Sequence, residues 1–422
     1  MPRILSFILI IYCFIIGFLG REVGKLPYGI FIEIFLLLIL IAVIIKKPLK
    51  EWTNLNKDIF YLLLIWFVLS LIEVINPGAA FMGWLNEIRT AALYPLLIVS
   101  LGLIVFSVKK DLDVFLVIIF CFSSLAAFNG IKQLYIGFFP GEAAFLQNGG
   151  AVTHMLWGKL RVFSFYSDAG QFGASQAHVG IIALIISFAP MKLWKRILFI
   201  GCAMLNLYGM LISGTRGAIF IFFVAAFVAI VLSKNVKSII LGGFIVISSI
   251  GILKYTSIGD GNYQIYRMRT ALNPNDASLK VRFDTQMRLK SYMADLPFGG
   301  GLGVLGYNGN LYNSDKYLNK FQPDSFFVKV WVMYGVVGLT IWFSIMMYIF
   351  GKCCSIAWCV RNTELRIKVI ALTAGFAGIL VGCYGNEVIN IMPTSIIVYF
   401  SWVFIYKSPT WDDKYSDKEV LS

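Results

Sequence analysis

Long apolar runs recur along the whole 422-residue chain, separated by shorter polar connections. A run of about 20 apolar residues can cross a bilayer as a helix, and in lipid only helices and closed barrels satisfy every backbone polar group. Such runs lie at about 4–20, 30–45, 59–76, 88–106, 114–133, 173–190, 196–213, 217–233, 239–254, 326–350, 367–384 and 390–406. The sequence therefore predicts an all-α polytopic integral membrane protein with about 12 transmembrane helices.

The composition supports this class. Hydrophobic residues make up 59% of the chain and charged residues only 14%, whereas soluble proteins average about 45–50% and about 25%. The formal net charge of +14 would suit a nucleic-acid partner, but the chain has no nucleic-acid motif and its charges lie mostly between the spans. We expect a single transmembrane domain over 1–406, a cytoplasmic tail over 407–422 and no nucleic-acid partner.

Alternate short connections are rich in Lys and Arg, and the positive-inside rule places these connections in the cytoplasm. They are the segments 46–57, 109–110, 192–196, 234–237 and 352–366. An even number of spans then places both termini in the cytoplasm. Two long loops, 134–172 and 255–325, fall on the outer side, which in a bacterium faces the periplasm.

The second long loop is strongly basic. From Arg267 to Lys290 it carries six Lys or Arg residues against two Asp, and such a patch favours an anionic partner. Loops this long are usually functional, disordered or linkers. We take the loop as the segment around which the function is organised.

An amphipathic helix is predicted inside this loop from about Ser278 to Ala294. It is closed by Pro297 and by the glycines of 299–303. Its polar face carries Arg282 one turn before Gln286, so we expect it to lie on the membrane surface or to cap a cavity. The glycine run lacks the Lys and the preceding strand of a phosphate-binding loop, and is predicted to be a flexible turn.

Arg216 is the first candidate site residue. It lies in LISGTRGAIF, between two apolar spans with almost no loop, where a guanidinium is costly unless it is paired or faces a polar cavity. Its small neighbours leave room for a ligand, and its planar fork suits a phosphate. An interfacial Arg that extends to the headgroups is the alternative.

Four further arginines are predicted on the outer side. Arg282 and Arg288 lie on the amphipathic helix, where a solvated face is the alternative. Arg161 lies in the first loop, in GKLRVFSFYSDAGQFG. Arg89 lies in NEIRTAALYP, close enough to Glu87 for a simple salt bridge.

Two carboxylates are candidate catalytic residues. Asp324 opens the tenth span as a possible base, although an N-cap role would explain it equally and would lower its pKa. Glu387, at the outer end of the eleventh span, is a second carboxylate that acts as a base or supports one. His154 is a weaker candidate, and His178 is read as a packed helix residue. Neither loop has clustered carboxylates and the cysteines lack metal-site spacing, so we expect no metal and no cofactor.

Three segments together resemble the O-antigen ligase and Wzy-type O-antigen and exopolysaccharide polymerase family. GTRGA at 214–218 is similar to the family's outer Arg in a turn that opens a span. VRFDTQMRLKSYMADLPFGGGLG followed by PDSFFVKVWVMYGVVGL is similar to its Arg-bearing periplasmic helix, Pro/Gly turn and polar residue before a span. RVFSFYSDAGQFG is similar to the stretch before an earlier span.

The resemblance implies a GT-C-like membrane glycosyltransferase whose donor is a glycan on undecaprenyl pyrophosphate. Arg216 and Arg282 would hold the pyrophosphate. Ligases of the family typically have His where this chain has Asp324, and this difference favours a polymerase.

The function expected from the sequence is polymerisation of lipid-linked repeat units of a surface polysaccharide, at the periplasmic face of the bacterial inner membrane. The expected partners are the undecaprenyl-pyrophosphate-linked oligosaccharide, membrane lipid and a possible chain-length regulator. Two alternatives remain: an O-antigen ligase that transfers glycan to the lipid A core of lipopolysaccharide, and a polysaccharide or lipid transporter or flippase.

Overall fold

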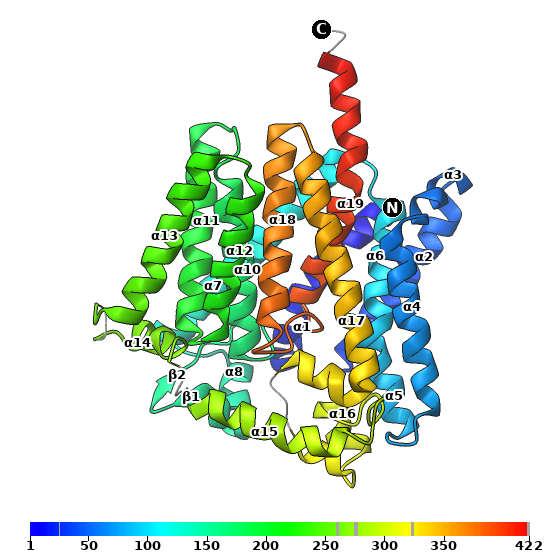
Figure 1. Ribbon diagram of the computed structural model, residues 1–422, viewed down its shortest axis with the longest axis vertical. Helices are drawn as coiled ribbons and strands as arrows, with labels where there is room; N and C mark the ends of the chain where they lie inside the picture. The colour runs from blue at the N-terminus through cyan, green and yellow to red at the C-terminus, as the bar shows by residue number, and fades with distance from the viewer. Residues whose placement is uncertain (25, 259–260, 274–276, 322–324, 420–422) are drawn as a thin grey trace.

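The computed structural model describes residues 1–24, 26–258, 261–273, 277–321 and 325–419. Over these residues the long helices run side by side (Figure 1), at the positions that the apolar runs predict. They are α1 (Pro2–Glu22), α2 (Tyr28–Lys46), α4 (Asp58–Ile72), α5 (Phe81–Ile88) with α6 (Tyr94–Val105), α7 (Lys109–Tyr135), α10 (Ala169–Ile186), α11 (Leu193–Ile212), α12 (Gly217–Leu232), α13 (Val236–Tyr255), α17 (Phe326–Cys359), α18 (Thr363–Gly382) and α19 (Thr394–Glu419).

Shorter elements fill the connections. Near the helix ends they are α3 (Leu49–Trp52), η1 (Thr53–Leu55), η2 (Glu73–Ile75) and η3 (Arg89–Leu93). In the first long loop they are α8 (Pro140–Phe145), η4 (Leu146–Gly150), α9 (Ala151–His154) and the antiparallel pair β1 (Met155–Leu156) and β2 (Lys159–Leu160). In the second they are α14 (Tyr263–Thr270), α15 (Ala277–Met293), α16 (Gly306–Tyr312) and η5 (Tyr317–Lys320). The predicted amphipathic helix corresponds to α15.

The chain is an all-α polytopic membrane protein. Within the described residues, 9 helical segments have both the length and the apolar character needed to cross a bilayer. α12, α13 and α19 fall outside this set, so the expected total of about 12 spans stays a prediction.

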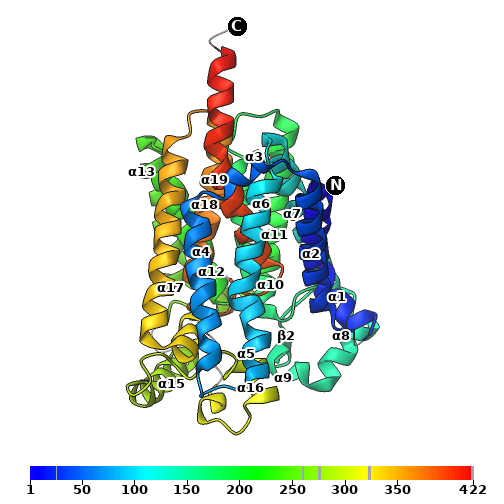
Figure 2. The same ribbon diagram turned by 90° about the vertical axis from the view of Figure 1, so that its right-hand side faces the viewer.

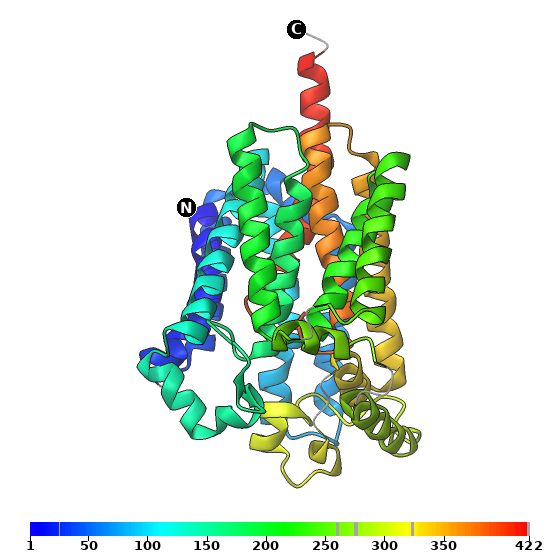
Figure 3. The same ribbon diagram turned by 90° about the vertical axis from the view of Figure 1, so that its left-hand side faces the viewer.

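Both long loops lie at one end of the helices, and both termini lie toward the other end (Figures 1 and 2). Figure 3 shows the first loop beside the second at that lower end. The short connection between α11 and α12 and the connection between α18 and α19 also reach it (Figure 1). At the opposite end α19 continues as a helix to Glu419, through residues 407–419 of the predicted tail.

The centre of the structure is the group α10, α12 and α18, which pack extensively on one another. α10 and α18 are buried along nearly their whole length. Small residues make this possible, because a Cβ at Gly378 of α18 would lie 2.6 Å from the backbone oxygen of Ile221 in α12. The start of α10 is thereby fixed at the loop end of the structure.

α5 passes into α6 through the π-helical turn η3. Pro95 has no N–H to donate to the carbonyl oxygen of Ala91, which instead accepts a hydrogen bond from Trp66 Nε1 (3.0 Å). The irregular turn therefore keeps its backbone satisfied by a side chain from α4, as buried backbone groups require.

Candidate functional site

The turn that carries Arg216 lies against the start of α10. Thr215 Oγ1 donates to the carbonyl oxygen of Ala169 (2.7 Å), and the Thr215 N–H donates to Ser213 Oγ (3.1 Å). Arg216 takes the N-cap position of α12. The small and hydroxyl residues of SGTR therefore join two helix beginnings, where backbone N–H groups favour an anion.

Arg267, which the sequence reasoning did not select, completes this turn from α14. Its Nε donates to the carbonyl oxygen of Gly214 (2.5 Å) and its Nη1 to the Tyr263 hydroxyl (3.2 Å). Gly214 has φ +58°, and a Cβ there would lie 2.9 Å from Arg267 Nε. Glycine is required at this position both by the backbone conformation and by the guanidinium packed against it.

Arg161 lies beside Arg216 and Arg267. Its Nη1 donates to the carbonyl oxygen of Thr153 (3.2 Å), while its Nε is buried with no hydrogen-bond partner in the part of the chain that the structure describes. The pKa of Arg161 is lowered to about 10, first by burial and then by the charges of Arg267 and Arg216, against the opposing charge of Asp168. Within the described residues, neither Arg161 nor Arg267 has a carboxylate within ion-pair distance. An anionic ligand would relieve this repulsion.

Arg282, on α15, lies near the start of α12, where Arg216 is the N-cap residue. Its Nη2 donates to the carbonyl oxygen of Gly385, in the connection between α18 and α19 (3.2 Å). A Cβ at Gly385 would lie 3.9 Å from the Cα of Gly217, so this connection lies against the start of α12. We call Arg161, Arg216, Arg267 and Arg282 the arginine site.

Glu387 lies two residues beyond Gly385 and belongs to a charged cluster. Lys329 Nζ lies 2.8 Å from Glu387 Oε2 and 2.9 Å from Glu87 Oε1. Asn308 Nδ2 also donates to Glu87 (2.7 Å). Burial raises the pKa of Glu387; the ammonium of Lys329 opposes this, and the charges of Glu87 and Asp168 add to it. One carboxylate is thus held by a buried cation beside the arginine site.

Asp168 lies near enough to both Arg161 and Glu387 for its charge to act on them. Its Oδ1 accepts from the Gln171 N–H (2.9 Å), which caps α10. Its charge acts on the pKa of both Arg161 and Glu387. The signal in the sequence was an Asp just before an apolar run, which indicates an N-cap.

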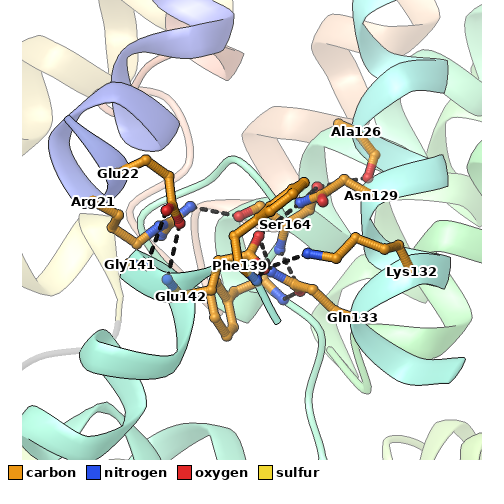
Figure 4. Close-up of polar contacts among 11 residues, drawn as sticks. Arg21, Glu22, Ala126, Asn129, Lys132, Gln133, Phe139, Gly141, Glu142 and Ser164 are labelled. Atoms are coloured by element: carbon orange, nitrogen blue, oxygen red, sulfur yellow. Dashed lines mark hydrogen bonds and ion pairs between the residues drawn. The ribbon is translucent and has the colours of Figure 1, made fainter. Parts of the chain in front are cut away.

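A buried carboxylate in the first loop, Glu142, binds polar side chains of α7 (Figure 4). Glu142 accepts hydrogen bonds from Asn129 Nδ2 (2.9 Å), Gln133 Nε2 (2.8 Å) and the Phe139 N–H (2.9 Å), and forms an ion pair with Lys132 (2.9 Å). Burial alone would raise the pKa of Glu142, but these four partners lower it. The carboxylate is charged and fully paired.

The end of α1 adds a second tie to the same loop (Figure 4). Glu22 accepts from the N–H groups of Gly141 (2.9 Å) and Glu142 (3.0 Å). Arg21 donates to the carbonyl oxygens of Ser164 and Tyr166. The first loop is therefore fastened to α1 and α7 through charged side chains.

The glycine run of the second loop is not the flexible turn that the sequence predicted. α17 is interrupted at Gly335 (φ +70°), and a Cβ there would lie 2.0 Å from the carbonyl oxygen of Pro297. Gly300 and Gly301 donate to the carbonyl oxygens of Val332 (2.8 Å) and Met333 (3.0 Å). The glycines allow two backbones to touch and hydrogen-bond.

Two predicted arginines lie outside the arginine site. Arg89 pairs with Glu33 of α2 rather than with Glu87, and Tyr94 donates to the same carboxylate (3.0 Å). Arg288 borders a separate hollow with Tyr292 and Tyr317. Asp324 lies outside the described residues.

The two histidines take supporting positions. His154 Nε2 accepts from the Ala169 N–H (3.2 Å) at the start of α10, and burial lowers its pKa. His178 is buried in α10 without a hydrogen-bond partner in the described part of the chain. Neither belongs to the arginine site.

Residues 201–343 match the family model for O-antigen ligase. This segment is similar to the O-antigen ligase family. It runs from α11 into α17 and contains three of the four residues of the arginine site, so the resemblance seen in GTRGA and in the Arg-bearing helix is confirmed. The family implies a membrane enzyme of the ligase or polymerase type that acts on lipid-linked oligosaccharides. No protein of curated function matches the chain.

Proposed function

We propose that the protein is a polysaccharide polymerase, which transfers a glycan from undecaprenyl pyrophosphate onto a hydroxyl of another lipid-linked repeat unit. The observation that carries this proposal is the convergence of Arg161, Arg216, Arg267 and Arg282 from four segments at the loop end. Among the described residues the buried Nε of Arg161 has no hydrogen-bond partner, and the charges of Arg267 and Arg216 act against that of Arg161; both features favour a bound anion. A diphosphate meets that requirement.

The proposed reaction breaks the bond between the anomeric carbon and the diphosphate oxygen and forms a new glycosidic bond to the acceptor oxygen. The electron pair leaves with the diphosphate, whose charge the arginine site stabilises through fixed donors. The acceptor proton passes to a carboxylate, for which we propose Glu387. Its raised pKa suits proton acceptance, and Lys329 holds it in place.

The distribution of basic residues supports a proposed orientation in the membrane. The connections rich in Lys and Arg lie at the end opposite the two long loops (Figure 1). By the positive-inside rule we place that end in the cytoplasm of a bacterium and the arginine site at the periplasmic face of the inner membrane. A chain-length regulator is a further proposed partner.

Ligation of finished O-antigen to lipid A core is the second candidate, and the description of the matching family favours it. The Asp at 324, where ligases typically have His, favours the polymerase. A deletion strain separates the two. Loss of a polymerase leaves single lipid-linked units, whereas loss of a ligase leaves long lipid-linked polymer.

Complementation of the deletion strain with Arg216→Ala, Arg267→Ala and Arg282→Ala tests the arginine site. Losing one preorganised donor costs roughly a hundred-fold or more in rate, so we expect the glycan ladder to collapse to single units while membrane levels stay normal. Arg361→Ala, an exposed Arg at the opposite end, is the matched control. Unchanged ladders in all three variants would exclude this site.

Purified protein supplies the direct test of activity. Given lipid-linked oligosaccharide alone, the wild type should produce longer lipid-linked glycans and free undecaprenyl pyrophosphate. Movement of the lipid-linked substrate across a vesicle membrane without elongation would instead indicate a transporter.

A further inference from the structure

A second hollow lies at the loop end, apart from the arginine site. It has a volume of about 620 Å³, within the range of small-molecule sites. Tyr292, Asp295 and Tyr317 line it together with Glu73 and Asn76 at the end of α4. The same two tyrosines and Asp295 continue into an adjoining hollow bordered by Arg288. We call this continuous surface the tyrosine groove.

Its aromatic side chains are accessible. The rings of Tyr292 and Tyr317 lie 4.7 Å apart between centroids at 38°, yet these residues are 42% and 45% exposed. Phe298 is 64% exposed on the same surface. Flat, half-exposed rings next to polar groups provide stacking surfaces for the C–H faces of sugar rings, because an aromatic face carries partial negative charge.

Carboxylates, amide and cations surround these rings. Asp295 and Glu73 offer oxygens that accept hydrogen bonds from paired sugar hydroxyls, and Arg288 and Lys316 offer donors. Asn76 Nδ2 donates to Glu73 Oε2 (2.9 Å), which orients that carboxylate. The acceptors, donors and aromatic surfaces of this hollow, beside apolar residues such as Ile72 and Leu296, suit a sugar, which has both hydroxyl groups and apolar C–H faces.

The floor of the tyrosine groove is rigid. Gly299 and Gly300 line it, and the backbone of this segment is hydrogen-bonded to the interrupted α17. Asn76 Nδ2 also donates to the carbonyl oxygen of Gly299 (3.4 Å). Because α4, α17 and the loop hold one another, the groove is formed before any ligand arrives.

α15 connects the tyrosine groove to the arginine site. Arg282 and Tyr292 are ten residues apart on this helix, which is about 15 Å along its axis. A glycan whose diphosphate lies at Arg282 can extend along α15 to the tyrosines. We propose that the tyrosine groove is a saccharide-binding subsite that holds the oligosaccharide part of a lipid-linked substrate; this rests on the proposed function.

A binding experiment with a lipid-free probe tests this proposal. Oligosaccharides released by mild acid from the lipid-linked glycans of cells that make the protein are added to purified full-length protein. Saturation-transfer NMR and calorimetry measure binding. We expect Tyr292→Ala and Tyr317→Ala each to weaken the affinity about ten-fold, and Asp295→Asn to weaken it less.

Two controls make the result decisive. Tyr307→Ala, an exposed tyrosine of α16 outside the groove, should bind like the wild type. Arg282→Ala should also retain binding, because the probe carries no diphosphate. Absence of wild-type binding, or wild-type affinity in both Tyr292→Ala and Tyr317→Ala, would overturn the proposed subsite. If elongation still depends on Arg216 in that case, the proposed function stands without it.

Discussion

The two long loops cover the same end of the protein but are held by different physical means. The first is fastened by charge, since Glu142 collects three hydrogen bonds and an ion pair and Arg21 and Glu22 bind its backbone. The second, between Pro297 and Asn313, is fastened by close backbone contacts and neutral amides. The stability that charged contacts contribute depends on pH. The stability that close backbone contacts contribute depends on the size of the side chain at the contact.

The largest expected effect is at the contact between α17 and the second loop. Gly335→Ala places a methyl group 2.0 Å from the carbonyl oxygen of Pro297 at φ +70°. Strain and overpacking together should lower the free energy of unfolding by about 4 kcal/mol or more. Thermal unfolding and gel filtration of the detergent-purified variant measure this.

Gly351→Ala is the control in the same helix, because a Cβ there meets nothing within 4 Å. It should be neutral or slightly stabilising, since Ala favours a helix by about 1 kcal/mol over Gly. Equal stability of the two variants would show that the contact between loop and helix is loose.

Glu142→Ala comes next in size. It leaves the amides of Asn129 and Gln133 and the ammonium of Lys132 without their shared acceptor. We expect a loss of about 3 kcal/mol, the lower part of the range for breaking a buried ion pair. Glu51→Ala, which removes a surface pair with Lys47, should cost about 0.5 kcal/mol or less. Similar melting of both variants would contradict charge-based fastening.

The smallest expected effect is on pH dependence. The pKa of Glu142 is lowered in the folded protein from its ordinary value of 4.5, so its contribution is complete above that value and is lost as pH falls through the lowered one. The difference in thermal midpoint between wild type and Glu142→Gln should therefore shrink on acidification below about pH 4.5.

Asn313→Ala provides the comparison for the second loop. It removes the hydrogen bond that the Ala80 N–H donates to Asn313 Oδ1 (2.7 Å) and the one that Asn313 Nδ2 donates to the carbonyl oxygen of Gly303 (3.0 Å). These groups do not titrate, so the stability difference should be the same at every pH. If the stability difference from the wild type changed with pH in the same way for Glu142→Gln and Asn313→Ala, the two loops would not differ in how they are held.

The sequence predicted the positions of the long helices and of α15 because periodicity and run length are local properties. It also selected Arg216, Arg282 and Arg161, which the structure brings together. It did not select Arg267, whose role depends on Gly214 of a distant turn. Lys329 was read as part of an apolar span, and only the fold reveals its two carboxylate partners.

Other differences arise for the same reason. Nothing near Arg89 in the sequence indicates Glu33, 56 positions away, as its partner. The glycine run was read as flexible because glycine is permissive in isolation; the interruption of α17 that it fits is a tertiary feature. Glu142 sits in a short segment whose meaning depends on α1 and α7 arriving from both sides.

The break at Gly335 makes the opening turns of α17 a separate short rod. That rod carries Lys329 midway along it, and its final carbonyls, at Val332 and Met333, hold the glycine segment. This segment of α17 thus positions both the glycines that line the tyrosine groove and the ammonium of Lys329 beside Glu387. The tyrosine groove and the cluster around Glu387 therefore share the first segment of α17 as a support, and we expect a displacement of this segment to move both.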